Sequence, residues 1–155
     1  MLALTKKSEY ALVAVCHMAR VGQRVVSARE IAEQHEVPLP LLMNVLKKLN
    51  RGRVVRSVRG ARGGYSLAVP PARLNLATVI EAVEGPVRLV NCVPGPEGTR
   101  RGCSRTDICS IRWPVRKVHE RLLEFLTGIT VADLAFDDKY RDVVRSREVG
   151  RAMAR

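Results

Sequence analysis

Apolar residues recur at intervals of three and four along the first 50 residues, a spacing typical of amphipathic helices. A first helix is expected from Lys6 to Arg20. A second begins after Ser27, which has the spacing of a capping box with Glu30. A third is expected from Pro40 to Asn50, because its apolar residues share one face: Leu42, Val45, Leu46 and Leu49. Two short helices joined by a tight turn, the second amphipathic and basic, predict a helix-turn-helix.

The pattern then changes to β-branched residues in alternation. One strand is expected at residues 54–58 and its return at 65–68, joined by a turn at 59–64 that is rich in Gly and Arg. A basic hairpin directly after a helix-turn-helix is typical of the wing of a winged-helix domain. A further helix is expected from Leu76 to Glu84, capped by Asn75 and ended by Gly85.

The C-terminal half contains one long segment without periodicity and one long helix. Residues 88–108 are expected to form a loop, and a loop of about 20 residues inside a compact domain is usually functional or disordered. The helix is expected from Ser110 to Gly128, and its apolar residues have the spacing of a coiled-coil seam: Ile111, Val115, Val118, Leu122, Phe125 and Ile129. An amphipathic core helix is the alternative. A dimer seam is favoured, because a regulator that reads two half-sites needs a partner.

These elements predict a mainly α fold, a winged helix-turn-helix with a long C-terminal dimerisation helix. The expected organisation is a DNA-binding domain at 1–86, a cysteine-bearing loop at 87–109, the dimerisation helix with a short final helix at 110–136, and a basic tail at 137–155. Thr130 is expected to cap the short final helix.

The charge distribution narrows the choice of partner. The 155 residues carry a formal net charge of +12, and residues 1–75 hold 13 Lys and Arg against 4 Asp and Glu. Such a charge favours a polyanionic partner, although a solvated basic face is the simpler alternative. Together with the helix-turn-helix, it favours double-stranded DNA. The expected DNA contacts are Ser27, Met43, Asn44, Lys47, Lys48, Arg59, Gly60 and Arg62.

No stretch approaches the roughly 20 apolar residues of a membrane span, so a cytoplasmic protein is expected. In that reducing compartment the four cysteines are free thiols or metal ligands. Cys16 lies among apolar residues and is expected to be a core thiol. Cys92, Cys103 and Cys109 share the loop, where thiolates can converge on iron or zinc, although three thiols leave a closed zinc site one ligand short. From these residues alone, metal or cluster ligands, redox thiols and incidental cysteines all stay open.

The chain resembles the family of iron–sulfur transcription regulators that includes IscR, NsrR and RirA. The resemblance covers residues 1 to about 136. The residues that carry it are Leu4 to Lys6 with Tyr10 and Ala11, Ile31 and Ala32, the hairpin at 57–65, Ala82 to Pro86, the three loop cysteines, Trp113, and Ile129 to Leu134.

The resemblance implies that Cys92, Cys103 and Cys109 hold a [2Fe–2S] or [4Fe–4S] cluster at the interface of a homodimer that binds a palindromic operator. Some members use as fourth ligand a His three residues after the last Cys, but this chain has Arg112 there. Others use a carboxylate near the N-terminus of the partner subunit, which matches Glu9. A solvated Glu9 is the alternative, and Asp107 is then the next carboxylate to consider.

Three other functions compete with this interpretation. A regulator of the same fold without a cluster would switch by thiol oxidation at the same cysteines. An electron-transfer enzyme is not expected, because the chain has no nucleotide-binding Gly motif and no second cluster motif. A purely architectural DNA-binding protein would explain the charge but not the cysteine loop.

Overall fold

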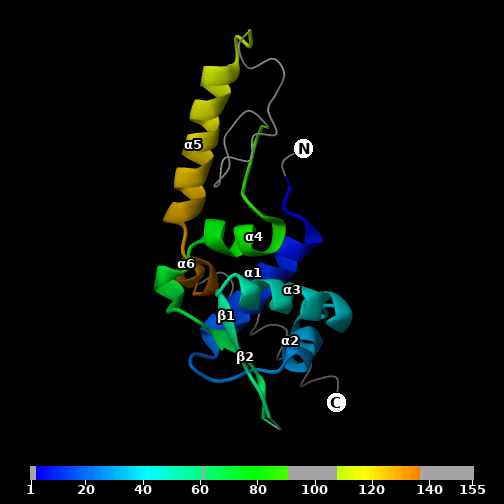
Figure 1. Ribbon diagram of the computed structural model, residues 1–155. Coiled ribbons are helices and arrows are strands. Elements are labelled where there is room, and N and C mark those ends of the chain that lie inside the picture. Colours follow the sequence, from blue (N-terminus) through cyan, green and yellow to red (C-terminus); the bar gives the residue numbers. More distant parts are fainter. Residues whose placement is uncertain (1–2, 61, 91–107, 137–155) are drawn as a thin grey trace, which may run out of the picture.

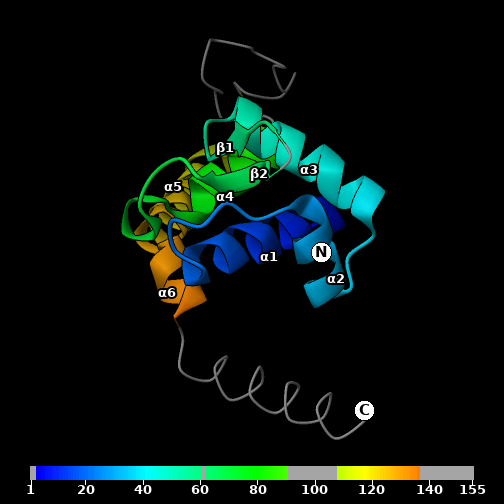
Figure 2. The same cartoon turned by 90° about the horizontal axis from the view of Figure 1, so that it is seen from below.

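The computed structural model describes residues 3–60, 62–90 and 108–136. Helix α1 (Lys6–Arg20) lies at the centre of the fold and packs against α2, α3, α4, α6 and the hairpin. Seen from below, α1 runs between α6 at one end and α2 at the other (Figure 2). The side chains of α1 that are fully enclosed are Ala11, Ala14, Val15 and Met18. Cys16 is also buried among core residues, so the prediction of a core thiol is confirmed.

Helices α2 (Ala28–His35) and α3 (Leu39–Arg51) form the expected helix-turn-helix. Helix α3 begins one residue earlier than expected, at Leu39, and the predicted buried face of Leu42, Val45, Leu46 and Leu49 is confirmed. The predicted capping box of α2 is only half formed. The Ser27 Oγ accepts the Glu30 N–H, but the Glu30 carboxylate pairs with Arg24 instead of returning to the Ser27 backbone.

The hairpin consists of β1 (Val55–Val58) and β2 (Gly64–Leu67), each slightly displaced from its expected bounds. The strands are antiparallel, with Val55 opposite Leu67 and Val58 opposite Gly64. Val26 adds a bridge on the other side of β2, through two backbone hydrogen bonds with Tyr65 of 2.9 and 2.8 Å. These bonds fix the hairpin to the segment that leads into α2, so the wing is anchored beside the helix-turn-helix.

Helix α4 (Leu76–Glu84) follows the short 3₁₀ turn η1 (Pro71–Arg73) and is capped by Asn75, as expected. Helix α6 (Val131–Ala135) starts with a complete capping box between Thr130 and Asp133. The hydroxyl and backbone N–H of Thr130 both donate to the Asp133 carboxylate and hold its pKa below the ordinary value. A backbone bridge between Asn75 and Thr130 joins the two helix starts.

Helix α5 (Arg112–Gly128) begins two residues later than expected and extends away from the rest of the described chain, with α4 near its base (Figure 1). Its only buried side chain is that of His119. The apolar residues Ile111, Val118 and Phe125 are 61%, 59% and 63% exposed. Half of the predicted seam is thus largely exposed, while Val115, Leu122 and Ile129 are half-buried.

Candidate functional site

The outer face of α3 divides into side chains that are free to meet DNA and side chains that are engaged within the protein. Asn44 and Lys47 are exposed. Met43 is partly buried and packs against the core, so little of it remains for a base contact. The Lys48 ammonium donates a hydrogen bond of 2.5 Å to the Val83 carbonyl of α4. Of the four α3 residues predicted to contact DNA, two are therefore exposed.

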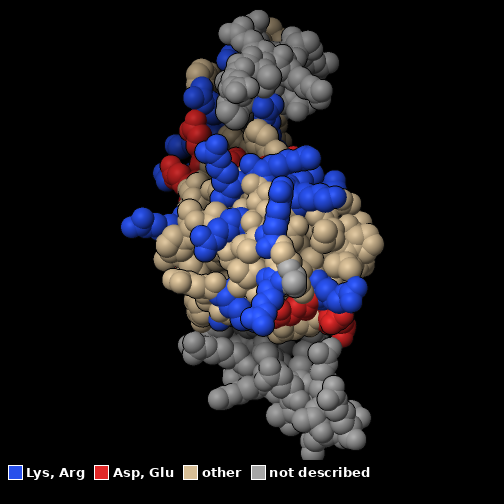
Figure 3. Space-filling view, turned by 60° about the horizontal axis from the view of Figure 1, so that its bottom comes forward, with Lys and Arg blue, Asp and Glu red and all other residues tan. Residues whose placement is uncertain are grey.

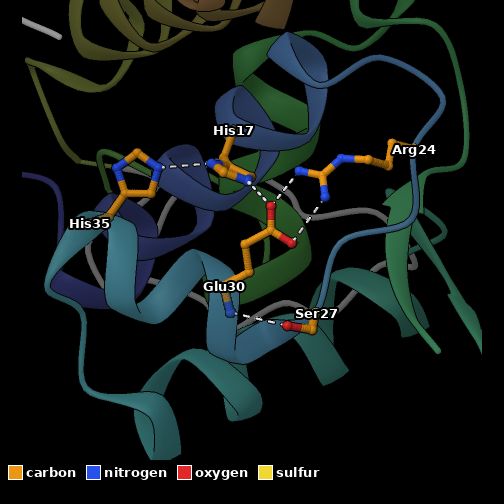
Figure 4. Close-up of polar contacts among 5 residues, drawn as sticks. All are labelled: His17, Arg24, Ser27, Glu30 and His35. Atoms are coloured by element: carbon orange, nitrogen blue, oxygen red, sulfur yellow. Dashed lines mark hydrogen bonds and ion pairs between the residues drawn. The ribbon is translucent and has the colours of Figure 1, made fainter. Parts of the chain in front are cut away.

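A polar cluster around the buried His17 holds α2 against α1 (Figure 4). The His17 side chain is 5% exposed, and its Nδ1 lies 3.1 Å from Nε2 of His35. Its other nitrogen, Nε2, lies 3.8 Å from the Glu30 carboxylate, which also pairs with the Arg24 guanidinium. Burial lowers the pKa of His17 below its ordinary value of 6.5, and the nearby Glu30 partly offsets this effect. Sequence reasoning missed this cluster, because His17 and His35 are 18 residues apart and no motif connects them.

The start of α2 is exposed, and so is the tip of the hairpin. Ser27 is exposed, with its hydroxyl engaged in capping α2. Arg59 and Arg62 are exposed on either side of the turn, where Gly60 has a φ of +113°, a conformation that L side chains rarely adopt. Arg56, lower on the hairpin, donates from Nε to the Ser66 hydroxyl across the strands at 2.8 Å. Two guanidinium groups are thus carried at the tip of a braced hairpin.

Basic side chains gather on the face where the hairpin comes forward (Figure 3). Acidic side chains lie mainly towards the margins of that view. Between residues 47 and 62, the exposed basic residues are Lys47, Arg51, Arg53, Arg56, Arg59 and Arg62. A positive surface that carries an exposed helix face and a basic hairpin has the charge and shape needed to follow a phosphate backbone.

The predicted cluster ligands are only partly within the described residues. Cys92, Cys103 and the alternative Asp107 lie outside them. Cys109 is a free, half-buried thiol just before α5. Glu9 is 43% exposed in the first turn of α1, and its Oε2 lies 2.6 Å from the Lys6 ammonium. Among the described residues, no three His, Cys, Asp or Glu side chains are grouped as metal ligands.

The donor types are those that an iron–sulfur cluster requires. Thiolates are the usual protein ligands of such clusters, and a carboxylate is an additional oxygen donor. Cys109 is half-buried, whereas Cys16 is buried, and burial raises the pKa of the Cys16 thiol and disfavours its thiolate form. The two described cysteines therefore differ in burial, and Cys16 is the less suited of the two to bind metal as a thiolate.

The remaining predicted interface residues lie along α5. Val115 and Leu122 are half-buried, while Ile111, Val118 and Phe125 are mainly exposed. Trp113 is 65% exposed, with the guanidinium carbons of Arg112 and Arg116 at 5.4 and 5.6 Å from its ring centroid. In the part of the chain that the structure describes, no helix is both long and apolar enough to span a membrane.

Comparisons with known proteins agree with this arrangement. Residues 4–137 match the family model of Rrf2, described as an iron-dependent transcriptional regulator. The transcriptional regulator IscR of Sodalis glossinidius is 33% identical over 144 residues, which cover 92% of this chain and 84% of IscR.

Two solved structures are similar in fold. CymR, the global cysteine regulator of B. subtilis, aligns with a TM-score of 0.68 and 25% identity over 87% of this chain and 97% of its own. IscR of T. potens aligns with a TM-score of 0.66 and 28% identity, over 86% of this chain and 85% of its own. These relatives are transcription regulators and not enzymes, and the match extends from α1 to the end of α6. The chain therefore belongs to the Rrf2 family of transcriptional regulators.

Proposed function

We propose that this regulator binds a palindromic operator in double-stranded DNA as a homodimer, and that it senses redox, nitric oxide or iron status through an iron–sulfur cluster. The observation that carries the proposal is the position of α5. This helix begins just after Cys109 and presents Ile111, Val118 and Phe125 to solvent. The predicted cysteine site is thus adjacent to the apolar face of α5, which lacks a partner within the described chain.

DNA binding would use the helix-turn-helix and the wing together. Asn44 would contact base edges in the major groove, with Met43 beside it, and Lys47 would contact the phosphates. The N-terminus of α2, with Ser27, would face the backbone, where helix N-terminal N–H groups favour phosphate. Arg59 and Arg62, beside Gly60, would enter the flanking minor groove, which attracts guanidinium groups when it is narrow.

Dimerisation would bury the seam of α5. Exposed apolar side chains in a row favour association with an identical seam, because burial removes apolar surface from water at about 25 cal/mol per Å². A two-fold symmetric dimer presents two reading heads and explains why its operator should be palindromic.

Cys92, Cys103 and Cys109 of one subunit, with Glu9 of the partner subunit, would hold the cluster. When bound, a [2Fe–2S] or [4Fe–4S] cluster supplies iron that reacts with oxygen, nitric oxide or thiols. The four ligands would hold the cysteine loop of one subunit against α1 of the other and so set the angle between the two recognition helices. Release of these ligands would change the half-site spacing and hence DNA affinity. Glu9 would bind iron through Oε1, or through Oε2 after release of Lys6.

A regulator of the same fold that switches by thiol oxidation, without a cluster, is the second candidate. The structural similarity leaves room for it, because the TM-score of CymR is close to that of IscR.

One experiment separates the two candidates. The full chain is purified without oxygen, examined by visible and Mössbauer spectroscopy, and tested for binding to a duplex selected from a random library. We expect a visible band and an iron signal that disappear in Cys109→Ser and remain in the matched Cys16→Ser variant. Absence of iron and of the band, together with DNA binding that responds to thiol oxidants, would establish the cluster-free mechanism instead.

A further inference from the structure

The last turn of α4 receives contacts from two separate parts of the DNA-binding domain. On one side it meets the recognition helix, since the Lys48 ammonium donates to the Val83 carbonyl at 2.5 Å. On the other side it meets the start of α1, since the Glu84 carboxylate accepts hydrogen bonds from the hydroxyls of Thr5 and Ser8. Lys48 and Thr5 thus bind adjacent residues of one helical turn.

The contact with Lys48 has a clear electrostatic basis. The last carbonyls of a helix have no donor within the helix and carry the negative end of its dipole. The Lys48 ammonium supplies a donor and a positive charge to Val83 at that end. Gly52, directly after α3, also packs closely against α4. A Cβ added at Gly52 would lie 2.8 Å from the Ala82 Cβ. The C-terminal half of α3 is therefore fixed to α4 by a charged hydrogen bond and by tight packing.

The contact with Glu84 reaches the N-terminus of α1. Thr5 is the N-cap of that helix, and its hydroxyl accepts the Ser8 N–H while it donates to Glu84. A carboxylate at a helix N-terminus is favoured by the dipole. Glu9, the proposed cluster ligand, follows Ser8 directly. A displacement of the first turn of α1 would therefore change the hydrogen bonds that Glu84 accepts from Thr5 and Ser8.

We propose that the last turn of α4 is a joint that connects the start of α1 with the recognition helix, and that Lys48 and Glu84 are its positioning residues. Lys48 therefore orients α3 and does not bind phosphate, in contrast to the adjacent and exposed Lys47. The link from Glu9 through this joint to DNA affinity rests on the proposed function, whereas the roles of Lys48 and Glu84 in positioning α3 do not.

The first test compares Lys47→Met with Lys48→Met in the full chain. Affinity for the selected duplex is measured by fluorescence anisotropy over a series of salt concentrations. Each lost phosphate contact reduces the slope of log K against log salt by about 0.9. We expect Lys47→Met to reduce the slope, and Lys48→Met to weaken binding at every salt concentration with an unchanged slope. Equal loss of slope in both variants would make Lys48 a phosphate contact and overturn the proposal.

The second test is a double-mutant cycle between Lys48→Met and Glu84→Gln, with Glu81→Gln as the matched control. Glu81 is an exposed carboxylate on the same helix. DNA affinity should be non-additive for Lys48 and Glu84, and additive for Lys48 and Glu81. Additive effects for both pairs would overturn the proposal that Lys48 and Glu84 act through one joint. Because the cycle does not require iron, it remains decisive even if the parent protein proves to hold no cluster.

Discussion

His17 Nδ1 and His35 Nε2 lie 3.1 Å apart, with their ring planes at 90°, and this contact joins α1 to the last residue of α2. One of these two nitrogens donates and the other accepts, and the tautomers of the two rings decide which does which. On its other side, Nε2 of His17 lies 3.8 Å from the Glu30 carboxylate. Burial favours the neutral form of His17, because it lowers the pKa of this side chain.

This geometry predicts a specific loss of stability in acid. Burial lowers the pKa of His17 in the folded protein below 6.5, so the unfolded chain takes up a proton that the folded chain rejects. The free energy of unfolding should decrease as pH falls from about 6.5 through the lowered pKa of His17. Denaturant titrations at a series of pH values should show a smaller decrease for His17→Gln than for the parent. Equal pH dependence, or an imidazole NMR titration of His17 at or above 6.5, would contradict the prediction.

The wing prediction concerns Arg59. Because this guanidinium is exposed at the tip of a hairpin braced by Val26, Arg59→Ala should weaken operator binding by about 1–3 kcal/mol without affecting the fold. Arg121→Ala is the control, since Arg121 is 74% exposed on α5. Anisotropy titrations with equal affinities for the two variants would remove the wing from the DNA interface.

The dimer prediction uses Phe125, which is 63% exposed and can be changed with little effect on the fold of the single chain. Phe125→Asp should convert the dimer to a monomer, because it places an unpaired charge in an apolar seam. Leu122→Asp should act in the same way, but Leu122 is half-buried and its loss also affects the fold. Lys117→Asp introduces the same side chain at an exposed position of α5 and should remain dimeric. Light scattering that finds Phe125→Asp fully dimeric would place the interface elsewhere.

The fourth-ligand prediction concerns Glu9. Glu9→Ala should retain iron on the three cysteines, while its visible spectrum shifts and bleaches faster in air. Lys6→Met is the informative partner variant, because it frees the Glu9 carboxylate from its ion pair and should keep the parent spectrum. If Glu9→Ala matches the parent in spectrum and in air sensitivity, Asp107 becomes the next carboxylate to test.

A packing prediction concerns Gly64. A Cβ at this position would lie 2.2 Å from the Val26 carbonyl oxygen, so Gly64→Ala must break the bridge between the hairpin and the segment before α2. We expect a loss of about 1–3 kcal/mol of unfolding free energy. Gly128→Ala is the matched control, because nothing lies within 4 Å of its added Cβ, and its stability should equal or exceed that of the parent. Equal denaturation midpoints for the two variants would contradict this.

The sequence alone determined the elements, because their signals are local. Apolar spacing located the buried face of α3, and Asn75 and Thr130 marked the starts of α4 and α6 through hydrogen bonds that span three residues. Errors occurred at element ends, such as the start of α5, where Ile111 has no side-chain cap to mark the boundary. The capping box at Ser27 failed for another reason. The Glu30 carboxylate forms an ion pair with the Arg24 guanidinium, and Arg24 is not one of the positions that define a capping box.

Only the tertiary structure decided which polar side chains are engaged with one another. His17 and His35 are 18 residues apart in the chain, Lys48 and Val83 are 35 apart, and Thr5 and Glu84 are 79 apart. Whether such pairs meet depends on how α1 crosses α2, and on how α4 packs against α1 and α3. These crossings are set by the packing of whole helix faces, which no short stretch of sequence specifies. For that reason Lys47 and Lys48, alike and adjacent in sequence, have different surroundings in the fold.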